Sequence, residues 1–359
     1  MTAVPGKLSF AWSRPSGSTI VEFCACLGDA LHRYAASRCF LVADARVMEL
    51  WGSEIRDILD PDEGDICLFN ALEENKSPTA LAGIWRRMDA AGVTRETTLI
   101  GLGGGLTCDI AALAASTWHR GTGLSLVPTT VLAMADACLG GKTAVNLEGA
   151  KNQVGTFYPA GTILIAGDFV NTLPPRDYRN GMAEILKAGL IGDRKIGDLL
   201  ASPPERDGDH CWLQDLVRRS LRVKGGIVSE DLTETGPRRL LNLGHTLGHA
   251  LESVSGFSLS HGEAVGLGTV AAAHMAGRKD LAGVVRELLG RIGLPDRLHH
   301  GTDVSIESME TFLRRDKKTS GDGRTWVFPF DWEDCRLVKL DAANEQRLLQ
   351  EALDFLLNG

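Results

Sequence analysis

The sequence lacks the segments that would place the protein in a membrane or mark it for export. No stretch approaches the roughly 18 consecutive apolar residues that cross a bilayer. The N-terminal residues MTAVPGKLSFAWSRPSGSTIVEF contain no basic start followed by a long apolar run, so no signal peptide is expected. The formal net charge of −8 argues against a general affinity for nucleic acid or anionic membranes. We therefore expect neither a membrane nor a nucleic acid as a partner.

Paired cysteines, internal repeats and low-complexity segments are missing as well. The eight cysteines are scattered and form no CxxC pair. This distribution argues against a disulfide framework and against a cysteine zinc knuckle. It predicts reduced thiols in a cytoplasmic protein.

The first half of the chain alternates short apolar runs with helical patterns. The expected strands are 38–44, 65–71, 96–105, 123–130 and 161–167, and the expected helices between them are 78–92 and 106–121. Strands that alternate with helices predict a parallel, doubly wound sheet. We therefore expect an α/β, Rossmann-like domain over residues 1–175.

The pattern changes after NTLPPRDYRN, which ends at residue 180. From 181 to 315 nearly every segment has helical spacing, with glycine or proline at the joints. Residues 325–330 and 335–340 predict a small hairpin, and 342–357 predict a last helix. We therefore expect a mainly α-helical domain over residues 176–359. A chain of 359 residues with 44% hydrophobic residues can build two such cores.

A glycine-rich turn, GLGGGLTCD (101–109), follows an expected strand and opens an expected helix. Glycines let the backbone approach a pyrophosphate, and the helix N-terminus offers unpaired N–H groups. The spacing is not GxGxxG, so the turn alone also fits a tight connection without a ligand. Asp44 ends a strand where an acid could accept ribose hydroxyls, although a helix N-cap explains it equally well. Thr129 and Thr130 end the next strand, at the sheet edge that binds ligands.

Three of the nine histidines lie in the stretch LLNLGHTLGHALESVSGFSLSHGEAV (240–265). His245 and His249 are four residues apart and can share one face of a helix, and His261 can come from the next helix. Glu184 stands among apolar residues and is a further candidate ligand, or an ion-pair partner of Lys187. Imidazoles and a carboxylate predict a zinc site with three protein ligands. The spacing leaves open which three of the four residues bind.

Several lysines and arginines stand in glycine-rich or apolar surroundings, despite the negative net charge. They are Arg120, Lys142, Lys151, Lys187, Lys224, Arg238, Lys317 and Lys318. A surface lysine is ordinarily just solvated. The small residues in GGKT and AKNQVG allow backbone and ammonium to approach a ligand together, which suits a small polyanion. GGKT lacks the G-x-x-x-x-G-K spacing, which argues against a nucleoside triphosphatase.

The motifs GGGLTCD, VPTTVLAMADACLGGKTAVN, AKNQVGTF, MAEILKAG, SEDLTETGPRRLLNLGHTLGHALE and SHGEAV occur in this order. Together they resemble the sugar phosphate cyclases, and most closely the 3-dehydroquinate synthases of the shikimate pathway, over roughly residues 38–330. The resemblance implies an N-terminal NAD-binding domain and a helical C-terminal domain that carries zinc, for which cobalt can substitute. It makes Glu184, His245 and His261 the metal ligands and places His249 beside the substrate.

The resemblance also implies roles for further residues. The implied cofactor contacts are Asp44, Glu73, Lys76, Gly104, Gly105, Asp109, Thr129, Thr130 and Thr172. We expect Lys151 to contact the cofactor as well. The implied phosphate contacts are Lys142, Asn152, Asn242, His249 and one of Lys317 and Lys318. Arg120 matches an arginine that reaches the phosphate from the partner subunit, which implies a homodimer. Lys224 and Arg238 match the binders of the substrate carboxylate, and Asp136, Lys187 and Glu234 match other active-site positions.

The implied reaction converts 3-deoxy-D-arabino-heptulosonate 7-phosphate to 3-dehydroquinate and phosphate. In the family, NAD oxidises the C5 hydroxyl, phosphate is eliminated, the hydride returns, and an intramolecular aldol step closes the ring. The zinc ion, as a Lewis acid, binds the C4 and C5 hydroxyls.

Two residues depart from the dehydroquinate synthase pattern, Thr156 and Pro159 in GTFYPAG. Threonine at this place resembles the cyclases of sedoheptulose 7-phosphate, which usually lose the second histidine that is kept here as His249. The amino-dehydroquinate synthases share nearly every motif, whereas 2-deoxy-scyllo-inosose synthases commonly have Asn at the place of Asp109. A metal-dependent polyol dehydrogenase and a catalytically silent binding protein remain as alternatives of other classes.

Overall fold

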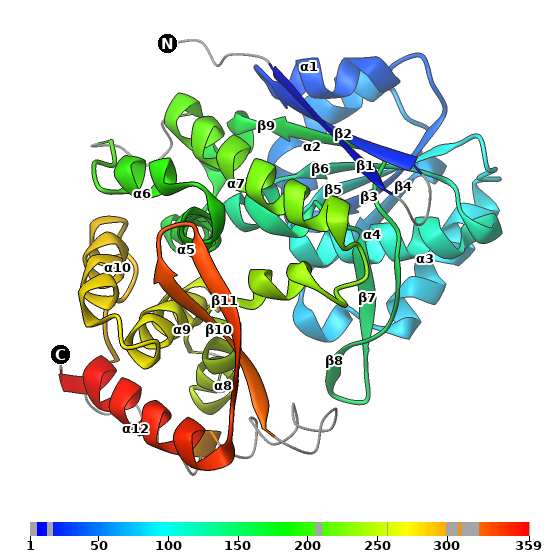
Figure 1. The fold of residues 1–359 in the computed structure, drawn as a ribbon. Coiled ribbons are helices and arrows are strands. Elements are labelled where there is room, and N and C mark those ends of the chain that lie inside the picture. The colour runs from blue at the N-terminus through cyan, green and yellow to red at the C-terminus, as the bar shows by residue number, and fades with distance from the viewer. Residues whose placement is uncertain are drawn as a thin grey trace. The chain divides into compact units, whose positions relative to one another are not determined.

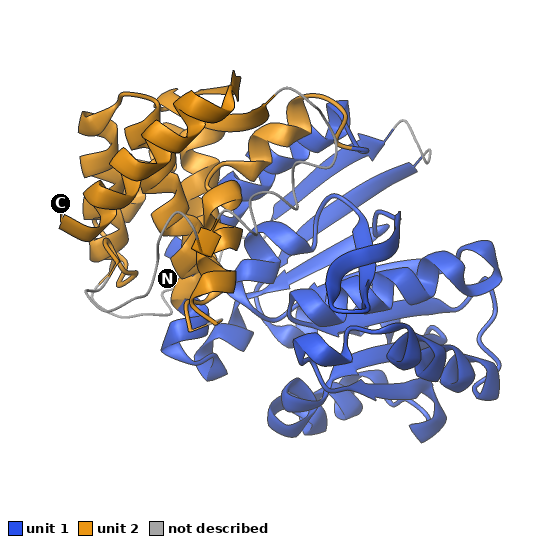
Figure 2. Ribbon diagram, turned by 90° about the horizontal axis from the view of Figure 1, so that it is seen from below, with its two compact units in different colours: residues 1–178, 206–233 blue, residues 179–205, 234–359 orange. Residues whose placement is uncertain are grey.

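The computed structural model describes residues 6–12, 17–204, 210–256, 258–298, 308–309 and 323–358. Its internal contacts divide the chain into two compact units, which Figure 2 shows in different colours. Unit 1 contains residues 1–178 and 206–233, and unit 2 contains residues 179–205 and 234–359.

Unit 1 is built on a seven-stranded sheet with the order β1-β2-β9-β6-β5-β3-β4 (Figure 1). The strands are β1 (Gly6–Trp12), β2 (Gly17–Cys24), β3 (Cys39–Asp44), β4 (Ile66–Phe69), β5 (Thr98–Gly103), β6 (Gly123–Pro128) and β9 (Thr162–Ala166). All neighbours from β2 to β4 pair in parallel, and only β1 pairs antiparallel, with β2. The inner strands are continuous apolar runs because both faces of the sheet are covered. The predicted α/β class is confirmed.

The connections of this sheet create a switch point at the carboxyl ends of β3 and β5. The helices involved are α1 (Leu27–Leu31), α2 (Ala45–Leu59), α3 (Pro78–Ala90) and α4 (Gly105–Thr117). From β3 the chain runs through α2 to β4 at the sheet edge, whereas from β5 it runs through α4 to β6 in the opposite direction. Right-handed crossovers then place α1 and α2 on one face and α3 and α4 on the other, in agreement with their contacts. Open α/β sheets bind ligands at such a point.

Two hairpins of unit 1 are absent from the sequence prediction. One is formed by β1 and β2, which extend the main sheet beyond β9. The other is formed by β7 (Lys142–Leu147) and β8 (Ala150–Phe157), which make a separate two-stranded sheet. Every residue of β8 is exposed, so its sequence carries no alternation between a buried and a solvated face.

Helix α7 (His210–Glu230) belongs to unit 1, although the sequence places its residues within the helical segment 176–359. It packs on β1 and on η5 (Ala133–Ala137), a single turn of π-helix. Gln214 Nε2 donates to the Cys24 carbonyl at 3.2 Å, and Ser220 Oγ donates to the Ala135 carbonyl at 3.1 Å. Helical spacing reveals the helix but not the surface against which it packs.

Unit 2 is mainly helical, as predicted. Its elements are the greater part of α5 (Pro175–Gly192), α6 (Arg194–Leu200), α8 (His245–Val254), α9 (His261–Met275), α10 (Lys279–Arg291), α12 (Ala342–Asn358) and the hairpin of β10 (Arg324–Asp331) and β11 (Asp334–Leu340). Helix α9 is buried on all sides from Ala264 to Met275 and contacts α8, α10, α12 and β10. The predicted hairpin and last helix are confirmed. Among the described helices, none is both long and apolar enough to cross a membrane.

The packing of α7 on β1 predicts opposite effects for two adjacent glycines. A Cβ at Gly225 would overlap the ring of Phe10 in β1, whereas a Cβ at the exposed Gly226 would meet no atom within 4 Å. We expect Gly225→Ala to lower the free energy of unfolding by about 1–3 kcal/mol through overpacking. Gly226→Ala is the matched control and should raise it by about 0.5–1 kcal/mol, because alanine favours helix. Urea denaturation measures both, and equal effects would contradict the packing of α7.

Candidate functional site

A cluster of one carboxylate and two imidazoles lies in unit 2. Glu184 Oε1 is 3.1 Å from His261 Nε2 and 3.4 Å from His245 Nε2. One ligand atom from each residue lies within 4.8 Å of the other two. Glu184 comes from the middle of α5, and the two histidines are the first residues of α8 and α9. The structure thus brings together the three residues that the resemblance implies as metal ligands.

Close helix packing holds these residues in place. A Cβ at Gly268 of α9 would overlap the carbonyl oxygen of Gly244, the residue that precedes α8. Gly244 has φ 77°, a backbone conformation that favours glycine. A Cβ at this position would also overlap Val265 and Thr269 of α9, so the close contact between the helices requires glycine as well. The N–H of Gly262 donates to Asn180 Oδ1, which holds the start of α9 on α5. Small residues therefore let three helices meet where their ligands project.

Electrostatics keep the buried Glu184 ionised. Its side chain is 1% exposed and forms an ion pair with Lys187, one turn further along α5. Burial acts against the charge, but Lys187, His245 and His261 hold the pKa of Glu184 well below its usual range. The ion pair between Glu184 and Lys187, expected from the sequence as an alternative to metal binding, is therefore present. It is compatible with a role of Glu184 as a metal ligand.

The two histidines of the cluster differ in their protonation. Burial, aided by the Lys187 ammonium, lowers the pKa of His245 to about 3, which leaves a neutral ring. Burial acts in the same direction on His261, but hydrogen bonds to Glu184 and Glu252 prevail and raise its pKa to about 9. A divalent cation between Glu184 Oε1 and the two Nε2 atoms would take the place of the proton on His261. One carboxylate with two imidazoles suits a catalytic zinc, which keeps an open position for substrate.

His249 lies beside this cluster on α8. Its ring centroid is 5.3 Å from that of His245 and 6.1 Å from that of His261, and the residue is exposed. Ligand atoms of His249, Glu252 and His261 form a second group within 4.8 Å of one another. Glu252 is absent from the sequence prediction, although it follows His249 by three residues and therefore shares its helix face.

The switch point of unit 1 carries the features expected of a dinucleotide site. Helix α4 begins after Gly104, whose lack of a side chain leaves the first N–H groups of the helix without a side-chain cap. A Cβ at Gly103 would lie 2.7 Å from Thr107 and 3.0 Å from Asp44 Cβ, and one at Gly104 would lie 3.2 Å from Thr130 Cγ2. Thr107 Oγ1 is buried beneath this turn and has no hydrogen-bond partner in the described part of the chain. Packing within the turn therefore requires glycine at both positions, and the N-terminus of α4, which has no side-chain cap, fits a pyrophosphate.

Residues on both sides of the turn also have structural roles. Asp44 ends β3 and caps α2, accepting from Arg46 N at 2.8 Å, so the N-cap interpretation is confirmed, and burial raises the pKa of its carboxyl. Thr129 N donates to the Gly103 carbonyl at 3.0 Å, and Thr130 Oγ1 accepts from Ala133 N at 3.2 Å. Thr172 is exposed, and its hydroxyl accepts from Trp51 Nε1 at 3.0 Å. The first three of these predicted contacts surround the turn.

The side chain of a buried lysine contacts two other predicted residues. Lys76 is 3% exposed, and its Nζ lies 2.5 Å from Asp109 Oδ2 and 2.6 Å from Asn152 Oδ1. Burial raises the pKa of Asp109, although the Lys76 ammonium acts in the opposite direction. Asn146 of β7 donates to Glu73 Oε1 at 2.8 Å and accepts from Asn152 N at 2.9 Å. This network fastens the β7–β8 hairpin to the segment of Glu73 and Lys76.

Other predicted residues form pairs within each unit. In unit 1, Lys224 Nζ is 2.9 Å from Asp136 Oδ1 and donates to the Asp136 carbonyl at 2.7 Å. In unit 2, Asn242 Nδ2 donates to Glu234 Oε1 at 2.6 Å, and Arg238 is 3% exposed. Lys142, Lys151 and Arg120 are exposed, and Lys317 and Lys318 lie outside the described residues.

Three of the predicted residues have a left-handed backbone. The φ angles are 67° at Arg120, 55° at Asn152 and 61° at Glu234. Residues other than glycine rarely adopt this conformation, and it persists only where the surrounding structure enforces it. Asp60, His119, Glu148 and Glu333, which are not predicted site residues, share it.

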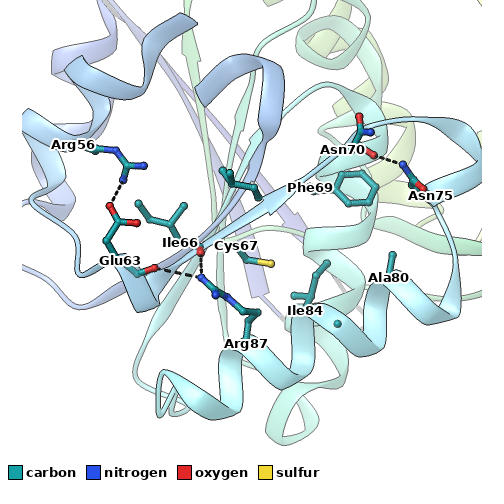
Figure 3. Close-up of a pocket in the computed structure, with 12 residues that line it drawn as sticks. Arg56, Glu63, Ile66, Cys67, Phe69, Asn70, Asn75, Ala80, Ile84 and Arg87 are labelled. Atoms are coloured by element: carbon teal, nitrogen blue, oxygen red, sulfur yellow. Dashed lines mark hydrogen bonds and ion pairs between the residues drawn. The ribbon is translucent and has the colours of Figure 1, made fainter. Parts of the chain in front are cut away.

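A groove of about 620 Å³ lies in unit 1 along the free edge of β4 (Figure 3). It is lined mainly by β4 and α3, and none of the predicted site residues is among its lining residues. Arg87 of α3 donates to the Ile66 carbonyl at 2.5 Å, and Arg56 is 3.2 Å from Glu63. Arg87 thus occupies part of the strand edge, and the groove is separate from the glycine turn.

Comparison with known proteins identifies the family. The family model described as 3-dehydroquinate synthase N-terminal matches residues 66–180, and the one described as 3-dehydroquinate synthase C-terminal matches residues 181–319. The chain belongs to the 3-dehydroquinate synthase family. The resemblance drawn from the motifs is therefore confirmed.

Individual members agree over most of the chain. The 3-dehydroquinate synthase of Pyrococcus abyssi is 39% identical over 308 residues, which cover 85% of this chain and 87% of that protein. The 3-dehydroquinate synthase of Pyrococcus furiosus is 36% identical and covers 91% and 96%. Among solved structures, ValA, the 2-epi-5-epi-valiolone synthase of Streptomyces hygroscopicus subsp. jinggangensis 5008, has a TM-score of 0.83. It is 30% identical, covers 95% of this chain and 96% of that chain, and has NAD⁺ and Zn²⁺ bound.

The geometry of the cluster predicts different zinc contents for two histidine variants. His261→Ala removes the imidazole that faces Glu184 and should reduce the zinc content from about one ion per chain to background. His249→Ala is the matched control and should keep the zinc. Elemental analysis after dialysis measures both contents, and NAD titration should show nearly unchanged cofactor affinity. Unchanged zinc in His261→Ala, or its loss in His249→Ala, would refute the ligand assignment.

Proposed function

We propose that this chain is a 3-dehydroquinate synthase, which converts 3-deoxy-D-arabino-heptulosonate 7-phosphate to 3-dehydroquinate and phosphate. The observation that carries the proposal is the cluster in which Glu184 Oε1 faces His245 and His261 at 3.4 and 3.1 Å. The relatives from Pyrococcus support it over most of the chain. The reaction class is that of a NAD- and metal-dependent carbon–oxygen lyase.

NAD and zinc, or cobalt, are the proposed cofactors. The glycine turn of unit 1 fits a dinucleotide, and the donor set of unit 2 fits a divalent cation. ValA, which holds both NAD⁺ and Zn²⁺, supports the combination. When bound, NAD supplies reversible hydride transfer and the cation supplies Lewis acidity. Because substrate and products are at the same oxidation level, no NADH is released.

The cationic residues bind the two anionic groups of the substrate. Lys142 and Asn152, which lie on the β7–β8 hairpin, are assigned to the phosphate. Lys224 and Arg238, at 7% and 3% exposure, are assigned to the carboxylate. Cations withdrawn from water bind anions more strongly than solvated ones, because less hydration is lost on binding. Lys187 differs from these cations because it forms an ion pair with Glu184 and keeps that carboxylate ionised.

The enzyme is proposed to act as a homodimer in which Arg120 completes the phosphate site of the partner. Arg120 is exposed and its backbone is left-handed, while Arg95 fixes the preceding residue by donating to the His119 carbonyl at 2.7 Å. Val154 and Phe157 of β8 are 47% and 37% exposed, on a strand with one unpaired edge. An exposed strand edge with apolar side chains is typical of a surface that pairs with another chain.

The proposed location is the cytoplasm, and the proposed partners are the sugar phosphate and a second copy of the chain. All eight cysteines are free thiols, as expected in a reducing compartment. The net charge of −8 gives no attraction for nucleic acid.

A sugar phosphate cyclase of the sedoheptulose 7-phosphate type is the second candidate, and Thr156 favours it. The Thr156 hydroxyl donates to Ser116 Oγ of α4 at 2.9 Å and is 3.2 Å from Thr143 Oγ1 of β7, so the threonine joins the hairpin to α4. The retained His249 and the pair of Lys224 and Arg238 favour the carboxylate-bearing substrate.

A substrate panel tests the proposed activity. With heptulosonate phosphate, catalytic NAD and zinc, we expect about one phosphate per substrate molecule and no accumulation of NADH, because the cofactor is restored in each turnover. Phosphate release and absorbance at the NADH band are measured together. Preferred turnover of sedoheptulose 7-phosphate would move the protein within the family, and steady NADH formation with a polyol would make it a dehydrogenase.

Mixing of two inactive variants tests the role of Arg120. Arg120→Ala lacks the arginine in both subunits, and His261→Ala lacks the metal in both. In a mixed dimer the Arg120→Ala subunit keeps its metal and receives Arg120 from the other subunit. We expect subunit exchange at equal amounts to restore up to about one quarter of wild-type activity. No recovery after exchange, with heterodimers verified by native mass spectrometry, would show that Arg120 does not act across the dimer.

A further inference from the structure

His261 uses its two ring nitrogens for two different carboxylates. Nε2 faces Glu184 Oε1 at 3.1 Å, and Nδ1 faces Glu252 Oε2 at 3.5 Å. The nitrogen that binds a cation must offer a lone pair, so the other nitrogen of a neutral ring must carry the proton. In His261 this proton points to Glu252. The arrangement fixes Nε2 as the metal-binding nitrogen.

His245 provides an internal comparison. Its Nε2 also faces Glu184, but its Nδ1 lies 3.1 Å from the carbonyl oxygen of Leu243. Both histidines of the cluster therefore have an acceptor behind the ring, a neutral carbonyl for one and a carboxylate for the other. A carboxylate acceptor raises the basicity of the imidazole more than a carbonyl does.

The position of Glu252 suits this role. Its side chain is 12% exposed, and it lies on α8 seven residues after His245, on the same helix face. Helix α8 therefore supplies one metal ligand itself and supports the ligand at the start of α9. The hydrogen-bond distance of 3.5 Å is long, and a cation at Nε2 would strengthen the bond by making the Nδ1 proton more acidic.

Charge supports the same conclusion. Glu184 and Lys187 form a buried pair whose charges cancel. A divalent cation beside this pair lacks compensation unless another anion is near. Glu252, in contact with His261, places a carboxylate beside the cluster.

We propose that Glu252 is a positioning residue of the metal centre, which orients His261 through Nδ1 and increases its affinity for the cation without binding the cation itself. The inference rests on the metal assignment of the proposed function.

The test compares Glu252→Gln and Glu252→Ala with the wild-type chain in zinc affinity, measured by competition with a chelator. Gln keeps an acceptor of the same shape but loses the charge, and we expect about tenfold weaker zinc binding. Ala removes the acceptor, and the loss should approach about 100-fold. The cobalt-substituted proteins should show a shift of the visible absorption bands, because the basicity of a ligand changes. The thermal midpoint of the metal-free Gln variant should equal that of the wild type.

Three results would overturn the inference. Equal zinc affinity and equal cobalt spectra of Glu252→Gln and the wild type would limit Glu252 to a packing role. Two ions per wild-type chain, with one lost in Glu252→Gln, would make Glu252 a ligand of a second site with His249. A wild-type chain that binds no zinc would instead remove the metal assignment of the proposed function, together with this inference.

Discussion

A fully buried carboxylate is the constraint on which the helical unit depends. Glu184 is 1% exposed, and a charge withdrawn from water is tolerated only when other groups compensate for it. Lys187 compensates from the same helix, and His245 and His261 compensate from two others. Because three helices must approach one atom, glycines stand at the closest points between them, and α9 is buried from Ala264 to Met275. The buried charge of Glu184 therefore accounts both for the close packing of the three helices and for the convergence of the candidate metal ligands.

The α/β unit also contains a buried charge that polar neighbours compensate, but here the buried charge is positive. Here the withdrawn charge is the ammonium of Lys76, and Asp109 and Asn152 compensate for it. The parallel sheet contributes the switch point, where β3 ends at Asp44 and β5 runs into the glycine turn. In each unit, secondary-structure elements hold the polar residues in place around one buried charge. That charge is Lys76 in unit 1 and Glu184 in unit 2.

Local patterns in the sequence predict the elements well. The alternation of strands and helices predicts the parallel sheet, and helical spacing predicts α8, α9 and the last helix, because these patterns reflect burial along each element. The motif resemblance selects Glu184, His245 and His261 from four possible ligands, which spacing alone leaves open. The location of α7 in unit 1 and the β7–β8 hairpin were beyond prediction, since one depends on a distant surface and the other has no buried face. Glu252 is the last residue of the motif GHTLGHALE, but its contact with the ring of His261 is visible only in the fold.

The hydrogen bonds of Asn146 have a consequence for ligand binding by the proposed enzyme. They join the segment of Glu73 and Lys76, assigned to the nucleotide, to the β7–β8 hairpin, assigned to the substrate phosphate. Lys76 adds a hydrogen bond to Asn152 of the hairpin. A shift of either segment would break these hydrogen bonds unless the other segment moved with it. In the proposed enzyme, binding of the dinucleotide and binding of the sugar phosphate are therefore coupled, and each ligand should change the affinity for the other by the same factor.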